Sequence, residues 1–205
     1  MKICGITRLQ DAEAAVGLGA NALGFVFWPK SARYIDPLRA KPIIAALPPF
    51  VSAVGVFVNQ SPDEVNDAAR LACLAVVQLH GDETPQQAAL IDRPIVKALT
   101  LDSAGQELET WPANVTVLLD AHDPDRRGGT GRTIDWGAVE PIARRRRLLL
   151  AGGLNPDNIS EAVGRVRPFG VDISSGVETA PGIKDPLRLR ALFENLNGIN
   201  SAPRS

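Results

Sequence analysis

The sequence predicts a single-domain α/β fold, a (β/α)₈ TIM barrel, from three observations. Eight short apolar runs follow one another along the 205 residues, and nearly every run precedes a segment that opens like a helix. The runs are continuous rather than alternating, which is typical of parallel strands covered on both faces. Strands that alternate with helices at this rhythm form βαβ units. Eight such units favour a closed barrel, at the small end of that fold's range of about 200 residues upward.

The predicted strands are the apolar runs themselves, and most of them end abruptly in small or polar residues. In chain order they occupy residues 2–6, 22–27, 52–58, 74–81, 94–99, 115–120, 147–153 and 169–176.

Capping residues and prolines mark the predicted helix starts between these strands. Ser61 and Thr84 are each followed by proline and, three residues on, by Glu or Gln, the pattern of a capping box. Thr7 with Gln10 offers the same pattern without the proline. Asn155-Pro156 and Asp185-Pro186 indicate two later starts.

Three further segments have less regular patterns. Asp36-Pro37 begins a helix in which Pro42 implies a kink or a late start. The polar segment 103–110 is expected to be a short helix. Residues 122–132 form the longest glycine-bearing loop, which we expect to move or to wrap over the site.

The chain length and the lack of a linker segment favour one domain. We expect the barrel to span residues 1–196, followed by a frayed polar tail at 197–205, because no linker divides the chain. An open doubly wound sheet is the alternative architecture. No GxGxxG motif follows the first strand, and eight parallel strands are more than that fold usually carries.

Composition excludes several classes of function. A hydrophobic content of 45% with a net charge of −1 indicates no general affinity for nucleic acid or membranes. No apolar run approaches the length needed to span a bilayer. Cys4 and Cys73 form no disulfide framework, and we expect a cytoplasmic location. The basic run 144–147 fits a solvated face better than a nucleic-acid patch.

Two small-residue turns suggest a phosphate site. Gly152-Gly153 and Ser174-Ser175-Gly176 each follow an apolar strand directly. Glycine lets the backbone approach a ligand, and successive N–H groups form an anion nest. Either turn alone fits an ordinary tight turn equally well, but together they favour phosphate.

Cys4 and Asp120 are the candidates for proton transfer, because both end strands at the barrel face where working residues lie. Cys4 fits either a small buried hydrophobe or a thiolate base, and Lys2 on the same strand face would favour the thiolate. Asp120 fits either a loop anchor or a general acid whose pKa is raised by desolvation. Cys73 is expected only to pack, and His80 is one of two histidines, too few for a metal site.

Taken together, the motifs resemble those of the phosphoribosylanthranilate isomerase family. The resemblance covers nearly the whole chain through KICGIT, GFVFWPKSARY, GVFV, VQLHGDE, LLLD with GGTGRTIDW, LAGGLNPDN and GVDISSGVETAPGIKD. It implies a cofactor-free Amadori rearrangement of a small phosphorylated substrate in tryptophan biosynthesis, by a monomer or homodimer. By motif, Cys4 would be the general base and Asp120 the general acid.

The resemblance also implies the binding residues. Arg33 would pair with the anthranilate carboxylate, where a guanidinium fork fits two oxygens. The phosphate would lie on Gly152, Gly153, Ser174, Ser175 and Gly176. The sugar pocket would be lined by Gln78, His80 and Asp172.

Two competing functions remain open at this point. Another phosphate-binding barrel isomerase, such as the ProFAR isomerase of histidine synthesis or a dual-substrate isomerase, is similar in fold but has an aspartate where this chain has Cys4. A catalytically inactive barrel kept as a binding module is disfavoured, because every position matched by motif is intact.

One residue departs from the family pattern. Ala32 stands where the motif around Arg33 normally has proline, so we expect a less rigid loop and weaker preorganisation, with activity retained. Substituting Ala32→Pro should therefore improve substrate affinity. Steady-state kinetics of the two chains check this, and unchanged or worse affinity counts against it.

Overall fold

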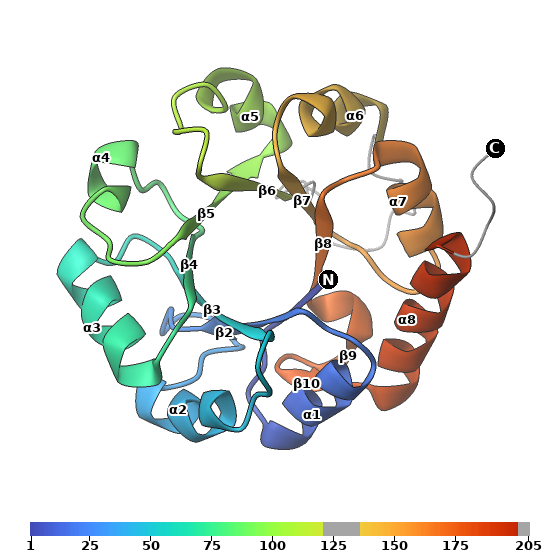
Figure 1. Ribbon diagram of the computed structural model, residues 1–205, viewed down its shortest axis with the longest axis horizontal. Coiled ribbons are helices and arrows are strands. Elements are labelled where there is room, and N and C mark those ends of the chain that lie inside the picture. Colours follow the sequence, from blue (N-terminus) through green and yellow to red (C-terminus); the bar gives the residue numbers. More distant parts are fainter. Residues whose placement is uncertain (121–135, 201–205) are drawn as a thin grey trace.

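The computed structural model describes residues 1–120 and 136–200, and its strands close into a barrel surrounded by helices (Figure 1). Each of the eight barrel strands pairs in parallel with the next, and β1 pairs with β8 to close the ring. This confirms the predicted (β/α)₈ architecture. The predicted loop at 122–132 lies outside the described residues.

Strands and helices alternate along the chain. The barrel strands are β1 (Lys2–Cys4), β2 (Ala22–Val26), β3 (Ser52–Phe57), β4 (Val76–Leu79), β5 (Ile95–Thr100), β6 (Thr116–Asp120), β7 (Leu148–Ala151) and β8 (Gly170–Ile173). The helices are α1 (Leu9–Gly17), α2 (Pro37–Ala45), α3 (Pro62–Ala72), α4 (Pro85–Ala88), α5 (Leu101–Glu107), α6 (Trp136–Arg145), α7 (Ile159–Val166) and α8 (Pro186–Asn200). In the described ranges, none of these helices has the length and apolarity to cross a membrane.

The helix starts follow local hydrogen-bonding chemistry. Ser61 and Thr84 make the predicted capping boxes. Each hydroxyl accepts a hydrogen bond from the backbone N–H of the third helical residue, whose side chain accepts one from the backbone N–H of the cap. Thr100 makes a third capping box, so α5 begins at Leu101, ahead of the predicted segment. Asp36 accepts from Leu38 N, and α2 continues through Pro42 without a late start. These side chains satisfy amide groups that a helix end would otherwise leave unpaired.

Two predicted helix starts are wrong. Thr7 does not cap α1, because its hydroxyl donates to the carbonyl of Gly182 at 2.5 Å, and α1 begins after Arg8 without a side-chain cap. Helix α7 begins at Ile159 rather than at Asn155-Pro156. The Asn155 side chain instead accepts from Asp157 N at 2.8 Å, which makes a turn ahead of the helix.

The C-terminal helix is longer than the sequence pattern indicates. Helix α8 reaches Asn200, so residues 197–200, which we expected in the tail, belong to a helix. Residues 201–205 lie outside the described residues.

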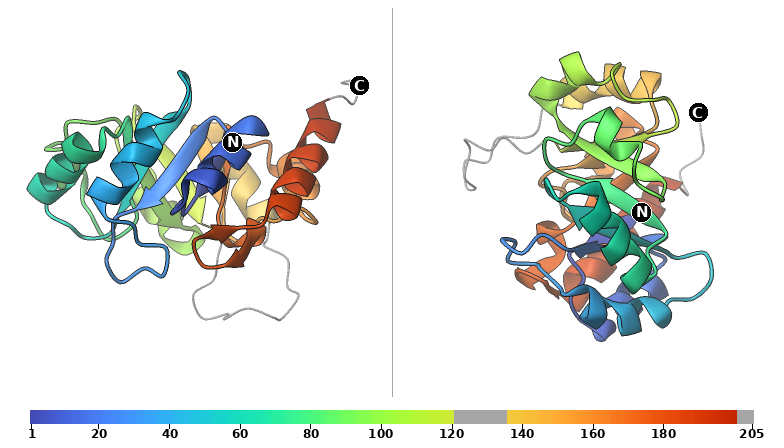
Figure 2. Two further views of the ribbon diagram at one scale, coloured as in Figure 1. Left: turned by 90° about the horizontal axis from the view of Figure 1, so that it is seen from below. Right: turned by 90° about the vertical axis from the view of Figure 1, so that its left-hand side faces the viewer.

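A short hairpin, β9 (Glu178–Ala180) with β10 (Ile183–Lys184), follows the 3₁₀ turn η1 (Ser175–Val177) and was not predicted. Figure 2 shows this hairpin projecting on the same side of the barrel as the loop after β2. That side is the mouth at the carboxyl ends of the strands, where barrel enzymes carry their sites. The hairpin therefore belongs to the surroundings of the candidate site.

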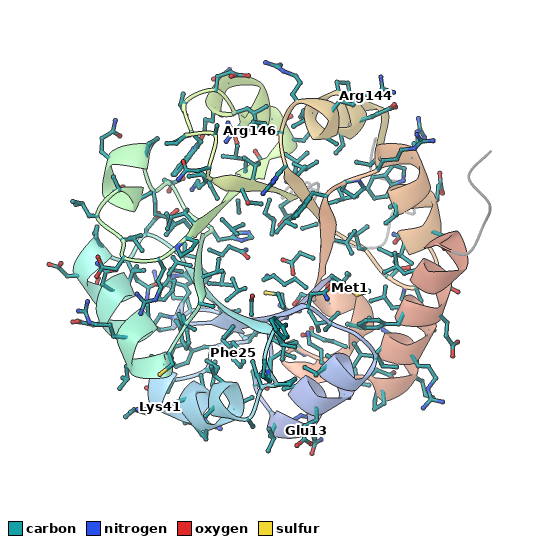
Figure 3. All side chains as sticks on the ribbon, viewed as in Figure 1. Met1, Glu13, Phe25, Lys41, Arg144 and Arg146 are labelled. Carbon is teal, nitrogen blue, oxygen red and sulfur yellow. The ribbon has the colours of Figure 1, made fainter. Side chains whose placement is uncertain are left out.

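The apolar core separates into a large layer and smaller inner clusters. The large layer lies between strands and helices and includes Phe25 (labelled in Figure 3), which is fully buried. A separate cluster contains Cys4, Val26 and Val56, with Trp28 packed against it. Because strand residues alternate between faces, the cluster around Cys4 faces the barrel interior.

The arginine run after α6 serves the structure of this region. Arg146 donates to four carbonyls of the α5–β6 connection, at 2.7 to 3.1 Å, and so fastens that loop. Arg144 pairs with Glu140 at the outer edge of the helical ring (Figure 3). Arg147 lies over the ring of Phe169 at 5.4 Å. Arg145 pairs with Glu109, so the four side chains have separate partners, which agrees with a solvated face.

Candidate functional site

A cavity of about 570 Å³ opens at the mouth of the barrel and collects most of the predicted site residues. The predicted residues that line it are Cys4, Arg33, Gln78, His80, Asp120, Gly152, Gly153, Asp172, Ser174 and Ser175. Gly176 lines a neighbouring hollow with Asn155 and Arg188. The thiol and the carboxyl group that we expected to face one ligand thus open onto the same cavity.

Cys4 ends β1 with its side chain almost fully buried beside Val26 and Val56. Gly24 lies opposite it in register on β2, and a Cβ atom there would come within 2.7 Å of the sulfur. Burial raises the pKa of the Cys4 thiol, because a thiolate loses hydration in the apolar cluster. The apolar surroundings therefore favour the thiol over the thiolate.

Lys2 and Asp172 form a buried ion pair next to Cys4. Lys2 Nζ contacts both carboxylate oxygens at 2.9 Å, and the two side chains are only 4% and 8% exposed. Burial opposes the charge on Lys2, but the attraction to Asp172 and Cys4 outweighs it and raises the pKa of Lys2. Lys2 also lowers the pKa of Cys4, as we expected, but burial outweighs that effect.

Gln78, His80 and Asp120 form a chain across the cavity from β4 to β6. Gln78 Nε2 lies 2.9 Å from His80 Nδ1. His80 Nε2 in turn lies 3.6 Å from a carboxylate oxygen of Asp120. If the Gln78 amide donates to Nδ1, the imidazole proton is on Nε2 and faces Asp120. The buried Gln78 Oε1 accepts no hydrogen bond from the described residues.

The two small-residue turns lie against each other at the far side of the cavity. Gly152 and Gly153 have φ of 90° and 66°, a left-handed conformation that other residues rarely adopt. A Cβ atom at Gly176 would come within 1.9 Å of the carbonyl oxygen of Leu154. The close contact between the turns therefore requires glycine at 176. Together they provide a backbone-lined recess suited to an anion.

Arg33 reaches the cavity from the loop after β2. Its backbone N–H donates to the Ser31 hydroxyl at 3.1 Å, which holds the turn that contains Ala32. Its guanidinium pairs with Glu178, with Nε 3.0 Å from both carboxylate oxygens and Nη2 2.7 Å from one. The hydrogen bonds that Arg33 donates to the Glu178 carboxylate raise the pKa of Arg33. One edge of the fork that we expected to bind a ligand carboxylate is therefore already occupied.

Glu178 and Lys184 are polar residues of this region that sequence reasoning missed. Both lie on the β9–β10 hairpin, both are buried, and their side chains pair at 2.7 Å. The motif GVETAPGIKD has Glu178 and Lys184 between a strand and the helix start at Asp185, which was the available signal. Nothing in that pattern tells buried charges from solvated ones.

The described residues contain no group of three or more His, Cys, Asp or Glu side chains that could hold a metal ion. The chemistry that this cavity can perform is proton transfer between a thiol and a carboxyl group, with an anion held nearby.

Comparison with known proteins identifies chains that are similar over nearly the whole length. The family model for N-(5'-phosphoribosyl)anthranilate (PRA) isomerase matches residues 1–195. The N-(5'-phosphoribosyl)anthranilate isomerase of Citrifermentans bemidjiense is 49% identical over 200 residues, which cover 97% of each chain.

Two solved structures are similar over most of their length. A phosphoribosyl anthranilate isomerase in complex with reduced 1-(o-carboxyphenylamino)-1-deoxyribulose 5-phosphate is 42% identical, with a TM-score of 0.86 and coverage of 96% of this chain and 97% of that one. Monomers generated from the dimeric phosphoribosylanthranilate isomerase of Thermotoga maritima are 41% identical, with a TM-score of 0.84 and the same coverage.

The contact between the two turns can be tested through anion binding. Substituting Gly176→Ala should weaken binding of inorganic phosphate by about tenfold, because the new methyl group collides with Leu154 and moves the amide groups. Gly164→Ala on α7 is the control, since a Cβ atom there meets nothing within 4 Å. Phosphate titrations by calorimetry measure both, and equal affinity in the two variants would place the anion elsewhere.

Proposed function

Since the chain belongs to the N-(5'-phosphoribosyl)anthranilate isomerase family, we propose that it converts N-(5-phosphoribosyl)anthranilate into 1-(2-carboxyphenylamino)-1-deoxyribulose 5-phosphate, in tryptophan biosynthesis. The observation that carries the proposal is the shared cavity of Cys4 and Asp120, with the two small-residue turns on its wall. An Amadori rearrangement needs one proton donor, one proton acceptor and an anchor for the sugar phosphate. The cavity contains residues suited to all three.

The first step is ring opening by Asp120. Its protonated carboxyl group gives a proton to the furanose ring oxygen, and the bond between that oxygen and C1′ breaks. The lone pair of the anthranilate nitrogen forms a C1′ imine that is protonated on nitrogen as the bond breaks. His80, 3.6 Å from Asp120, is placed to influence the charge on this carboxyl group.

The second step is proton removal by Cys4. The imine acidifies the C2′–H bond, and the Cys4 thiolate takes that proton to give an enolamine. Tautomerisation of the enolamine gives the ketone product. A positioned donor or acceptor contributes roughly 10²–10⁴-fold to such a step, so both residues are needed for useful rates.

The remaining predicted residues hold the substrate. We assign the phosphate to Gly152, Gly153 and the turn at 174–176, where backbone N–H groups approach an anion closely. Arg33 takes the anthranilate carboxylate on the edge of its guanidinium that Glu178 leaves open.

The sugar hydroxyls contact the polar side chains between these two ends. We place Gln78, His80 and Asp172, which all line the cavity, in this sugar pocket. The rearrangement moves protons within one molecule, so it requires no cofactor or metal ion. Assembly as a monomer or homodimer stays a prediction, supported by the dimeric relative from Thermotoga maritima.

Substitution separates catalytic from structural roles. Cys4→Ser and Asp120→Asn should each lower kcat by roughly 10²–10⁴-fold, because each removes one proton-transfer group. Cys73→Ser and Asp102→Asn, at exposed positions, are the matched controls. Loss of substrate fluorescence measures turnover, and circular dichroism checks folding. Near-normal turnover in a folded Cys4→Ser or Asp120→Asn variant would show that the substituted residue is not the general base or the general acid.

The pH dependence follows from the buried thiol. The pKa of Cys4 is raised by burial, so a thiolate forms only above the ordinary range of cysteine. With a base of higher pKa than the acid, kcat/KM is flat between the two pKa values and falls once the pH exceeds that of Cys4. We expect this alkaline limb above the usual cysteine pKa.

Lys2 provides the control for this assignment. Removing its charge by Lys2→Met withdraws a cation that lowers the pKa of Cys4, so the alkaline limb should move to higher pH. If the alkaline limb of kcat/KM in the unsubstituted chain lies below the usual cysteine pKa, Cys4 is not the base.

A further inference from the structure

A cluster of buried charges beneath the Arg33 loop has no part in the proton transfers. It consists of Glu178 and Lys184 on the β9–β10 hairpin, 7% and 2% exposed, together with the guanidinium of Arg33. Buried charges are unfavourable unless they are paired and hydrogen-bonded. The arrangement of this cluster shows what it holds in place.

Lys184 connects the hairpin to two barrel strands. Its Nζ donates to the carbonyl of Cys4 at 2.5 Å, to the carbonyl of Ser174 at 3.3 Å and to Glu178 Oε1 at 2.7 Å. An ammonium group has three donors, and these three acceptors use all of them. Lys184 therefore fixes the Glu178 carboxylate relative to the ends of β1 and β8.

The hairpin is held from outside as well. Lys184 N donates to the buried carboxylate of Asp11 at 3.1 Å, and the Thr7 hydroxyl donates to Gly182 O at 2.5 Å. Within the hairpin, Gly182 N donates to Glu178 Oε1 at 3.2 Å. The Glu178 carboxylate thus accepts hydrogen bonds from Lys184, Gly182 and Arg33. The pKa of Glu178 is lowered by its two cationic partners although burial opposes this, so it stays ionised.

Arg33 meets this fixed carboxylate with one defined edge. Nε and Nη2 both contact Glu178, and this is the side-on edge of the guanidinium. The end-on edge, formed by Nη1 and the second hydrogen of Nη2, is not used by Glu178. Gly5 leaves room for this pose, because a Cβ atom there would lie 2.7 Å from Arg33 Cδ. Arg33 also lines the cavity, so its open edge is presented to a ligand.

We propose that Glu178 is a positioning residue for Arg33, which fixes the guanidinium so that its end-on edge selects ligands that carry a carboxylate on the aromatic ring. The inference rests on the proposed role of Arg33. Glu178 does not contact the ligand itself. It confers carboxylate selectivity by preventing the long, flexible Arg33 side chain from adopting other poses.

The test compares two ligands that differ only in the carboxylate. They are reduced 1-(o-carboxyphenylamino)-1-deoxyribulose 5-phosphate and its counterpart with a plain phenyl ring, and calorimetry gives a Kd for each. Glu178→Gln keeps the shape of the side chain but removes its charge. It should raise the Kd of the carboxylated ligand by about tenfold or more and the Kd of the phenyl ligand by less than about twofold.

Asp11→Asn is the matched control. Asp11 holds the same hairpin through Lys184 N but does not touch Arg33. A loosened hairpin should weaken both ligands equally, so Asp11→Asn should leave the ratio of the two Kd values unchanged. Equal weakening of both ligands by Glu178→Gln would overturn the positioning role.

A further variant keeps the proposal testable if Glu178→Gln does not fold. Arg33→Lys can still pair with Glu178, but an ammonium has no second planar edge, so the selectivity for the carboxylate should be lost. Retained selectivity would overturn the proposal. Failure of the proposed function would look different, because the parent chain would then bind neither ligand.

Discussion

The seam between β1 and β8 is the constraint on which the rest of the structure depends. The barrel closes only if the first and last strands pair, and Lys2 lies opposite Asp172 in that pairing. Their ion pair is buried, and removing one partner of such a pair typically destabilises a fold by about 3–5 kcal/mol. Cys4 is two residues further along β1 and points to the same side. The pairing of β1 with β8 therefore both closes the barrel and positions the Cys4 thiol.

The same seam determines the electrostatics around the thiol. Lys2 and Lys184 each lower the pKa of Cys4, whereas Asp172 and burial raise it. Each lysine is itself paired with a carboxylate, Lys2 with Asp172 and Lys184 with Glu178, so neither offers an unbalanced positive charge. Burial consequently prevails over the two lysines and favours the neutral thiol. Such a site protects the thiol from oxidation, which requires a thiolate and exposure.

The features that the sequence predicted correctly are those that depend on residues close together in the chain. The continuous apolar strands, and the caps at Ser61 and Thr84, depend on neighbours within a few residues, and these predictions are confirmed. The ten predicted residues that share a cavity do so because strand ends in a closed barrel meet at one mouth. Thr7 resembles a cap in sequence, but its hydroxyl bonds to Gly182, 175 positions away. Glu178 likewise pairs with Arg33 across 145 positions, and no local pattern records that contact.

Under the proposed function, the parts of the cavity assigned to the ligand's charged groups are fixed by contacts within the protein itself. The turns at Gly152 and Gly176 are defined by backbone geometry, and the Arg33 guanidinium is held by a buried carboxylate. Groups that are already oriented lose little conformational entropy on binding, so more of the interaction energy remains for aligning the reacting atoms. With both ends of the ligand fixed, the sugar between them has only a narrow range of positions. In the proposed mechanism, the buried Cys4 thiol reaches C2′ only when the sugar is held in place, so the orientation of Arg33 and of the two turns affects proton removal as well as binding.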